Sequence, residues 1–275
     1  MYLALNQVVT ANNLTFQTDG IVSPEIYDLE KELTTRLNKD IKSWAKKELN
    51  SKDCRFVFKR EYIADVGIFL QKKRYILHAL DEEGIPCNKM KYTGVEIVRT
   101  TTPATLKPLL KNIIEVMFAT QDYQETNKIL NEVYTKFREL PIESIAKVSS
   151  LNNYEKYARD CKDFKPAKKM PAHCKAAYFY NRLLKIHKLD KNYEQLASGD
   201  KVRFFAVQKP NTYGIEVIGF KNTWPKEFNQ FFKLDYDTAY DKMVFSPIEK
   251  IYEAVNWKAY KPNLSVQTDL FDLFS

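Results

Sequence analysis

Apolar residues follow the period of an α-helix between residues 24 and 49. Intervals of three or four residues separate six large side chains, which therefore share one face of a helix: Ile26, Leu29, Leu33, Leu37, Ile41 and Trp44. Ser23-Pro24-Glu25 supplies an N-cap residue, a proline in the first turn and an early acid, and Asn50-Ser51-Lys52-Asp53 breaks the pattern. The sequence therefore predicts one long amphipathic helix that ends near Leu49.

Shorter segments on both sides of this helix have the composition of strands. Residues 2–9 and 14–22 alternate loosely between apolar and polar side chains, and residues 54–80 are rich in β-branched and aromatic residues. We expect two short β segments before the helix and a hairpin or meander after it, closed by the turn Asp81-Glu82-Glu83-Gly84.

Helical periodicity returns after Thr101-Thr102-Pro103, which has the form of a capped, proline-started helix. The predicted helices cover 103–118, 122–139, 173–188 and 236–255, and two strands at 201–208 and 213–220 flank the turn Lys209-Pro210-Asn211-Thr212. The change from strands to helices predicts a domain boundary near residue 100. The expected fold class is α+β.

The composition favours a folded protein with a polyanionic partner. The 275 residues are 44% hydrophobic and 13% aromatic, enough for a sizeable core, and only 7 are glycine, which argues against a Gly-rich nucleotide-binding fold. Lys and Arg number 43 against 35 Asp and Glu, giving a net charge of +8. A surface this basic favours polyanions, of which nucleic acid is the commonest.

Cysteine and histidine spacing indicates neither zinc nor disulfides. The four cysteines and three histidines are scattered, without a Cys-x-x-Cys pair: Cys54, Cys87, Cys161, Cys174, His78, His173 and His187. The first residues, MYLALNQVV, lack the basic start and long apolar run of a signal peptide, and no apolar run is long enough to span a bilayer. We expect reduced thiols and a soluble intracellular protein.

The segment Lys72-Lys73-Arg74-Tyr75 is the most specific candidate for chemistry. On a strand, Lys73 and Tyr75 would point to one side and Lys72 and Arg74 to the other. Cations beside a phenol suit a nucleic-acid backbone, whose phosphates meet the charges while the ring packs on sugar or base. Taken alone, the four residues equally describe a solvated edge strand that lysines protect from aggregation.

The surrounding sequence resembles the palm and thumb of family B replicative DNA polymerases from tailed bacteriophages. The palm resemblance lies in FKREYIADVGIFLQKKRYILHALDEEGI, and KYTGVEIVRTTTPATLK is similar to the entry to the thumb. IAKVSSLNNYEKY, PAHCKAAYFYN and the final WPKEF…LDYDTAYDKMVFSPIEKIYEAVNW continue the resemblance in the same order. The match covers residues 2–274. It implies a partial palm at 1–100, a mostly helical thumb with a small β element at 101–260, and a flexible tail at 261–275.

The resemblance also implies roles for individual residues. Lys72, Lys73, Arg74 and Tyr75 would grip the primer strand of primer–template DNA, and Gly94 and Glu96 would stand where the thumb begins, with Gly94 permitting close backbone approach. Arg60 and Glu61 would lie near the metal and triphosphate region, and Glu61 is a possible catalytic acid. His173 and Lys175 would face duplex DNA from the thumb. Here the chain departs from the family's His-x-Arg-Gly, because Lys175 lacks the bidentate fork of arginine.

A second departure concerns the catalytic hairpin. The family places Tyr-Gly-Asp-Thr-Asp-Ser directly before a strand similar to MYLALNQVV, and its aspartate binds the two Mg²⁺ ions of the reaction. Thr18-Asp19-Gly20 is only superficially similar, and an aspartate before glycine is an ordinary loop feature. We therefore expect no metal site on this chain. The resemblance implies an N-terminal partner chain carrying the exonuclease, the fingers, the rest of the palm and most Mg²⁺ ligands, and a location in the cytoplasm of a bacterial host.

The end of the chain resembles a sliding-clamp-binding peptide. A glutamine, an aliphatic residue and a hydrophobic pair follow a polar linker, and the residues implied in clamp binding are Gln267, Leu270, Phe271, Leu273 and Phe274. The other interpretation is a terminal segment that docks on its own thumb.

The expected function is DNA-directed DNA synthesis together with the partner chain, this chain being inactive alone. One alternative is a non-catalytic DNA-binding adaptor tethered to the sliding clamp. Another is a nuclease built on Glu61 and Asp65, which are four residues apart and would share one face of a strand.

Overall fold

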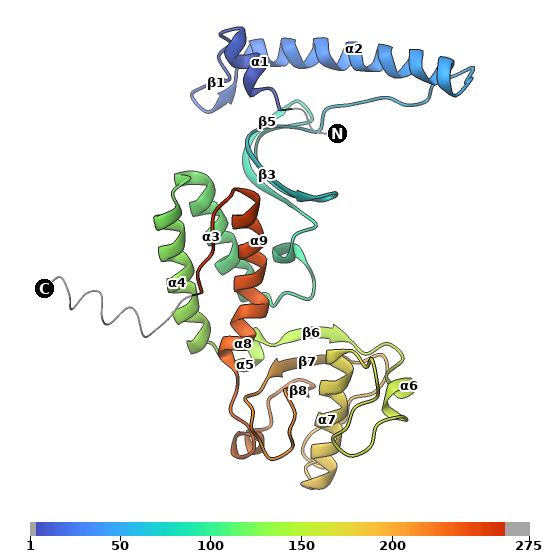
Figure 1. Cartoon of the computed structure of the whole chain (residues 1–275), viewed down its shortest axis with the longest axis vertical. Helices are drawn as coiled ribbons and strands as arrows, with labels where there is room; N and C mark the ends of the chain where they lie inside the picture. Colours follow the sequence, from blue (N-terminus) through green and yellow to red (C-terminus); the bar gives the residue numbers. More distant parts are fainter. Residues whose placement is uncertain (1–3, 262–275) are drawn as a thin grey trace, which may run out of the picture. The chain divides into compact units, whose positions relative to one another are not determined.

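The computed structural model describes residues 4–261 and divides the chain into two compact units. The first contains the residues up to Phe69 together with Tyr75–Thr93, and the second contains Leu70–Arg74 and the residues from Gly94 onward. Helices alternate with strands that form three separate sheets, which confirms the predicted α+β class (Figure 1).

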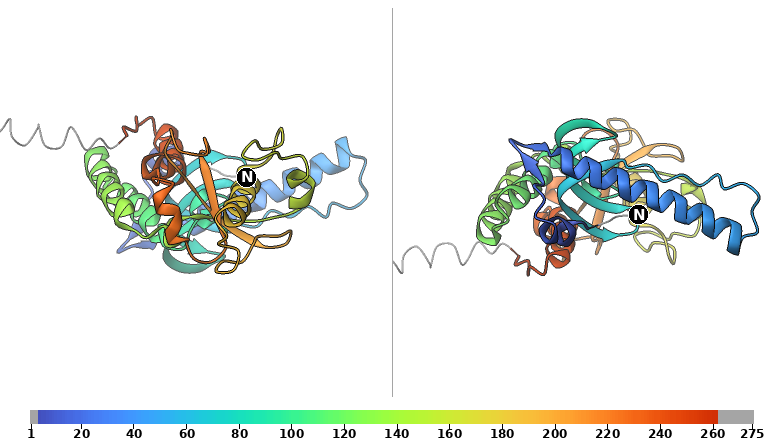
Figure 2. Two further views of the ribbon diagram at one scale, coloured as in Figure 1. Left: turned by 90° about the horizontal axis from the view of Figure 1, so that it is seen from below. Right: turned by 90° about the horizontal axis from the view of Figure 1, so that it is seen from above.

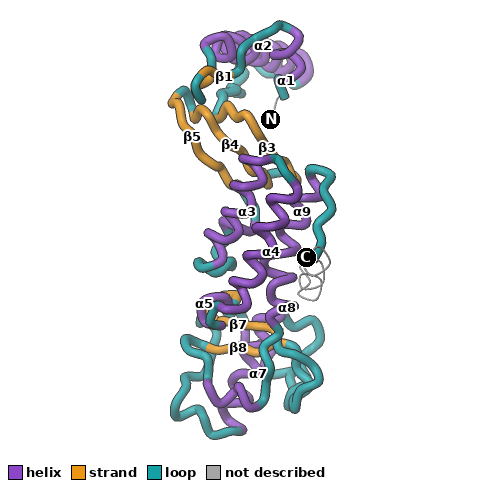
Figure 3. Tube along the Cα trace, turned by 90° about the vertical axis from the view of Figure 1, so that its left-hand side faces the viewer, coloured by secondary structure: helices purple, strands orange, loops and turns teal. Residues whose placement is uncertain are grey.

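The first unit combines a long helix with a three-stranded sheet. The predicted amphipathic helix is confirmed as α2, Pro24–Glu48, with Ser23 as its N-cap and Pro24 in its first turn; Figure 2 shows it as one unbroken rod. The sheet has the strand order β3–β4–β5 (Figure 3), with bounds Tyr62–Gln71, Arg74–Glu82 and Ile85–Thr93.

The residues before α2 differ in part from the prediction. Residues 6–11, expected largely in a strand, form the helix α1, Asn6–Ala11, with Val9 N–H donating to Leu5 O at 2.9 Å. A helix satisfies its backbone groups locally, whereas a strand needs a neighbour. The β segment expected at 14–22 is present only as a two-residue pair, β1 at Gln17–Thr18 and β2 at Ile21–Val22.

The third strand of the sheet was not predicted. β5 pairs antiparallel with β4, with Tyr75 opposite Thr93 and Asp81 opposite Pro86, and the register shifts between Ala79 and Asp81. Pro86 cannot donate to a ladder, and its place at the start of an edge strand explains why the segment lacks a clear strand signal.

One buried apolar cluster of the first unit lies near the start of α2, and the strands β3 and β4 bury Ile68, Ile76, Leu77 and Ala79 as well. Val22, Ile26, Ile63 and Leu80 form one buried cluster, against which four partly buried side chains pack: Val9, Leu14, Phe16 and Tyr27. Most of the apolar face of α2 is only half-buried, and Ile26 and Ala45 are its buried residues.

The second unit consists of helices around a second three-stranded sheet. The predicted helices are confirmed as α3, Leu106–Thr120, α4, Tyr123–Glu139, and α7, Ala172–Ile186. The helix expected to start at Pro103 begins three residues later, after Thr105. The sheet has the order β6–β7–β8, with bounds Lys147–Ser150, Lys201–Ala206 and Val217–Phe220. The remaining short helices are η1 Glu96–Val98, α5 Ile142–Ile145, α6 Tyr154–Ala158 and η2 Lys226–Gln230.

Helix α7 packs closely on this sheet. A Cβ atom at Gly219 of β8 would lie 2.9 Å from the carbonyl carbon and oxygen of Ala176, so only glycine allows the helix and strand to approach this far. Figure 1 shows α7 lying against β7 and β8. Seven of the α7 residues are buried, among them Tyr180 and Leu183.

The helical run expected at 236–255 is confirmed, with an irregularity in its middle. It comprises α8, Tyr236–Tyr240, the π-helical turn η3, Asp241–Phe245, and α9, Ser246–Ala254. Asp235 caps α8 by accepting a hydrogen bond from Thr238 N–H at 2.9 Å. Single π turns within α-helices occur frequently at functional sites.

Candidate nucleic-acid interface

The two lysines of the Lys72–Tyr75 segment form the turn between β3 and β4. β3 ends at Gln71 and β4 begins at Arg74, so Lys72 and Lys73 are turn residues, and both side chains are exposed. Lys73 has φ 61°, a left-handed conformation that is uncommon for a non-glycine residue. The prediction that these lysines alternate on a strand is wrong, because the chain reverses direction at them. Both cations instead stand at the tip of a hairpin.

Arg74 is held by the chain itself. Its Nη2 lies 2.5 Å from both carboxylate oxygens of Glu96, and its Nε donates to the carbonyl of Gly94 at 3.1 Å. Partial burial of Glu96 opposes its ionisation, but the hydrogen bond from Arg74, a backbone hydrogen bond and the charges of Arg74 and Arg99 together outweigh burial and lower the pKa of the carboxyl. The guanidinium therefore joins the hairpin tip to the start of η1.

Gly94 allows a close backbone approach between two segments of this chain, and its place at the start of a thumb stays a prediction. Its φ is +62°, and a Cβ there would lie 2.2 Å from the carbonyl oxygen of Lys73. No side chain fits in that space, so the residue fixes how closely the hairpin tip and the residues before η1 can lie. Thr102 Oγ1 donates to Glu96 O at 2.6 Å and fastens the following loop.

Tyr75 lies on β4, in the first unit. Its ring is half-buried, with its centroid 6.0 Å from that of Phe69 on β3. The ring of Phe69 is exposed. This pair gives the β3–β4 ribbon an aromatic surface close in sequence to the lysine turn.

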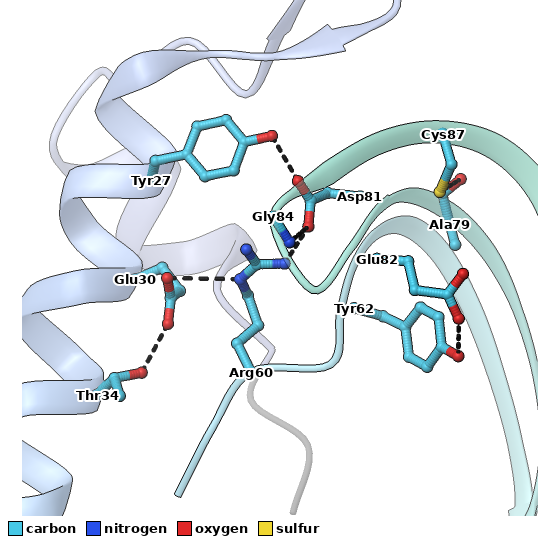
Figure 4. A network of polar contacts seen from close by, with 10 residues as sticks. All are labelled: Tyr27, Glu30, Thr34, Arg60, Tyr62, Ala79, Asp81, Glu82, Gly84 and Cys87. Atoms are coloured by element: carbon cyan, nitrogen blue, oxygen red, sulfur yellow. Dashed lines mark hydrogen bonds and ion pairs between the residues drawn. The ribbon is translucent and has the colours of Figure 1, made fainter.

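Arg60 belongs to a buried polar network in the first unit (Figure 4). Its Nη1 forms an ion pair with Asp81, and its Nε lies 3.4 Å from Glu30 Oε2 on α2. Asp81, fully buried, also accepts hydrogen bonds from Tyr27 OH at 2.8 Å and Gly84 N–H at 2.9 Å. Burial opposes ionisation of Asp81, but these hydrogen bonds and the ion pair lower its pKa below the usual value. In this structure Arg60 links α2 to the β4–β5 turn, and its role near a triphosphate stays a prediction.

The acids proposed for metal or nuclease chemistry do not converge. Glu61 is exposed and immediately precedes β3, whereas Asp65 accepts a hydrogen bond from His78 Nδ1 at 2.7 Å. The other ring nitrogen, Nε2, lies 2.7 Å from Asn88 Oδ1. Within residues 4–261, no three His, Cys, Asp or Glu side chains come together in a way that could hold a metal ion. Asp19 occupies the β1–β2 turn.

His173 and Lys175 lie in the first turn of α7, in the second unit. Residues that are two positions apart on an α-helix are separated by about 200° around the helix axis, so these two side chains lie on different faces. His173 is half-buried, and burial lowers the pKa of its ring. The clamp-binding candidates at 267–274 lie outside the described residues.

One group of cations was not singled out from the sequence. Lys147 on β6, Lys242 in η3 and Lys250 on α9 line a common pocket of the second unit together with Arg99. The signal available in the sequence was the four-residue spacing of Lys242, Ser246 and Lys250, which places them on one helix face. Lys147 gave no signal, because only the fold brings β6 to this helix.

Comparison with known proteins shows the family of this chain. Over 218 residues, or 76% of the chain, the sequence is 30% identical to a DNA-directed DNA polymerase of Escherichia phage RB69. The chain is therefore related to DNA-directed DNA polymerases. The matched region is 22% of the relative's length, so the chain corresponds to about a fifth of that enzyme. No protein-family model matches the sequence. In the part of the chain that the structure describes, no helix has the length and apolar character needed to cross a membrane.

Proposed function

We propose that this chain is the primer-gripping part of a family B phage DNA polymerase, a partial palm followed by a thumb and a clamp-binding tail. In the proposal it works with an N-terminal partner chain that supplies the exonuclease, the fingers and the rest of the palm. The relationship to a phage DNA-directed DNA polymerase supports this assignment. The observation that carries it is the pair of exposed lysines at a hairpin tip that Gly94 and the Arg74–Glu96 ion pair hold in place.

The hairpin tip has the properties of a grip on a nucleic-acid strand. Lys72 and Lys73 present flexible charges that meet phosphates, and Tyr75 offers an aromatic edge for sugar or base. The Arg74–Glu96 pair positions the tip, so Arg74 acts by orienting the lysines as well as by its charge. Precise placement of the primer matters, because a shift of about 1 Å can reduce the rate about 10²-fold. His173 and Lys175 are proposed to touch the duplex further from the primer end.

Magnesium belongs to the partner chain in this proposal. The described residues contain no convergent group of carboxylates to hold it, so they do not fit a two-metal centre. This chain then contributes by binding and orienting the DNA.

The tail is proposed to bind a sliding clamp. Gln267 and the apolar residues Leu270, Phe271, Leu273 and Phe274 have the order of a peptide that fills a clamp pocket. The second candidate function, a non-catalytic adaptor that binds DNA and the clamp, is favoured by the lack of a metal-binding cluster in residues 4–261.

DNA binding by the purified chain tests the proposal. Fluorescence anisotropy with a labelled primer–template duplex should show binding that is insensitive to sequence and weakens steeply as salt rises, because phosphates supply the affinity. A matched single strand serves as the comparison and should bind more weakly. Failure to bind the duplex at low salt would overturn both the polymerase function and the adaptor function. If the chain does bind, an assay of DNA synthesis distinguishes these two functions.

A further inference from the structure

A basic pocket of about 220 Å³ lies entirely within the second unit. Residues 96–103, Lys147 on β6 and residues 242–250 of the last helical run line it. Among the described residues, no carboxylate forms an ion pair with Lys147, Lys242 or Lys250. The pocket therefore presents three ammonium groups without acidic partners.

The one acid in the lining is already engaged. Glu96 holds Arg74 at 2.5 Å and lies 3.4 Å from Arg99. Burial first, and the neighbouring Lys242 second, lower the pKa of Lys147, and the charge of Glu96 offsets this only in part. A further carboxylate in the pocket would stabilise the charged lysines.

The chain returns to this region after its last helix. Beyond α9, the carbonyl of Lys258 accepts a hydrogen bond from Tyr123 OH of α4 at 2.9 Å. Lys261, the last residue that the structure describes, has its Nζ 2.9 Å from Asp241 Oδ1. Asp241 directly precedes Lys242 of the pocket, so the next residues of the chain start beside the pocket.

The sequence that follows carries two acids around two apolar residues. Asp269 and Asp272 flank Leu270 and Phe271. In a polyproline II conformation, residues three apart lie on the same side of the chain, about 9 Å from one another. The two carboxylates can then contact one surface together.

The wall formed by the last helical run has the complementary pattern. Lys242 and Lys250 are eight residues apart, which corresponds to about 12 Å along a helix axis. Met243 and Pro247, between them in the sequence, also line the pocket, together with Pro103. Lysine side chains are long and flexible enough to cover the difference in spacing.

The tail is long enough to reach both lysines. Eight residues separate Lys261 from Asp269, and an extended chain of that length spans up to about 26 Å. This exceeds the separation of about 12 Å between Lys242 and Lys250 along the helix.

We propose that residues 269–272 dock in this pocket of their own chain. The carboxylates of Asp269 and Asp272 pair with Lys242 and Lys250, and the apolar residues between the acids pack on the apolar part of the lining. The docking rests on charge and reach, whereas its consequence rests on the proposed function. Phe271 is one of the residues proposed to enter a sliding clamp, so a docked tail is withheld from the clamp.

Limited proteolysis of the full chain measures docking without DNA or clamp. Chymotrypsin cuts after aromatic residues, so mass spectrometry of the released peptide reports how often Phe271 is free. Lys242→Glu with Lys250→Glu should accelerate this cleavage about threefold to tenfold, the range that two weak ion pairs allow. The matched control, Lys128→Glu with Lys136→Glu, reverses two exposed charges of α4 at the same eight-residue spacing outside the pocket lining and should leave the rate unchanged.

An exchange of charges between tail and pocket tests the pairing itself. Asp269→Lys with Asp272→Lys should expose the tail, and the addition of Lys242→Glu and Lys250→Glu should restore its protection. Rates are compared only between chains that have the same tail, so any effect of the tail substitutions on the protease cancels. High salt should remove the protection in both matched pairs, because it screens ion pairs at the surface.

Substitutions confined to the tail decide the question even where the pocket variants do not fold. Asp269→Asn with Asp272→Asn should shift the backbone amide resonances of Thr101, Thr102 and Ser246, because the tail leaves the pocket. Unchanged resonances would overturn the docking. Equal cleavage rates in the wild type and a folded pocket variant would overturn it as well.

The outcomes separate the docking from the proposed function. Protection that is lost on dilution of the chain would overturn a contact within one chain and indicate a second copy as the partner. An unprotected tail on a chain that binds primer–template DNA would overturn the docking and leave the proposed function intact. A protected tail on a chain that does not bind this DNA would support the docking and overturn the proposed function.

Discussion

Two helices of the molecule, α2 in the first unit and α7 in the second, have very different surroundings. α2 is 25 residues long and buries only Ile26 and Ala45, whereas the 15 residues of α7 include seven that are buried. Trp44 on α2 is 47% exposed, and Phe56 and Val57 after it are 59% and 63% exposed. The amphipathic pattern is equally clear in both sequences. The difference lies in how much of each apolar face this chain covers.

The comparison shows that α7 buries much more of its apolar face than α2 does. In the second unit Tyr180, Phe220 and Phe228 are fully buried and meet other rings edge to face. In the first unit the strands bury Ile68, Ile76 and Leu77, and the Arg60–Asp81 ion pair lies beside a further cluster near the start of α2. The half-buried face of α2 suits a chain that packs against a partner, as the proposed function requires.

The largest expected effect comes from opening the core of the second unit. Phe137 of α4 is fully buried, with ring centroids 5.6 Å from Tyr240 and 6.2 Å from Tyr236. Phe137→Ala should destabilise this unit by about 3–5 kcal/mol through lost burial and a cavity. Amide hydrogen exchange in α3 and α4 at increasing urea concentrations measures this loss of stability. Ile85→Ala, at a side chain 71% exposed in the first unit, is the control and should change little.

The first unit should depend instead on its buried ion pair. Asp81→Asn leaves Arg60 with only its longer contact to Glu30 and should cost about 3 kcal/mol, because the guanidinium loses its fully buried partner. The folded pKa of Asp81 is lowered, so its contribution is present above the unfolded value of about 4 and is lost as pH falls through the folded pKa. Urea unfolding of wild type and variant should therefore converge in acid. Glu82→Gln, which breaks a more exposed contact with Lys89, is the control and should cost under about 1 kcal/mol. Equal losses in the two variants would contradict the role given to the network.

A matched pair of glycines tests the hairpin tip. Gly94 and Gly20 both have positive φ, but a Cβ at Gly94 would meet Lys73 O at 2.2 Å whereas one at Gly20 would meet nothing within 4 Å. Gly20→Ala should cost about 1 kcal/mol of backbone strain, and Gly94→Ala about 2 kcal/mol. Only the latter should weaken DNA binding, because only it displaces the lysine turn. Anisotropy and thermal unfolding of both variants measure the contrast.

The smallest effect concerns His78 in the first unit. Partial burial disfavours its charged form, but hydrogen bonds to Asn88 and Asp65 outweigh burial and raise its pKa. The contribution is thus fully present below the unfolded value of about 6.5 and is lost as pH rises through the folded pKa. His78→Gln should cost under about 1 kcal/mol at pH 6 and still less at pH 9. An NMR titration of the ring that gives a pKa below 6.5 would contradict this account.

The sequence predicted the elements whose signals are local. The long helix α2, the helices α4 and α7 and the strands β3 and β4 follow from periodicity and end signals. The prediction failed where the outcome depends on a distant partner. Residues 6–11, expected largely in a strand, form a helix, and Pro86, the second residue of β5, weakens the strand signal of that segment.

The candidate site shows the same division. The cluster of Lys72, Lys73 and Arg74 could be found from the sequence, but not that the two lysines occupy a turn and that Arg74 is bound to Glu96. Nothing near Lys147 in the sequence indicates that β6 brings it to Lys242. Contacts between residues that are distant in the sequence depend on tertiary packing, and the local hydrophobic periodicity does not predict them.

Primer extension tests the central claim most directly. The chain would be combined with a phage-encoded polypeptide that ends in Tyr-Gly-Asp-Thr-Asp-Ser and carries the exonuclease and fingers. The account predicts synthesis by the mixture and by neither chain alone, with Lys73→Ala impairing extension more than it weakens DNA binding. An inactive mixture in which this chain still binds primer–template DNA and clamp would contradict the polymerase function and favour the adaptor. Equal losses of extension and binding in Lys73→Ala would contradict the primer-gripping role of the hairpin tip.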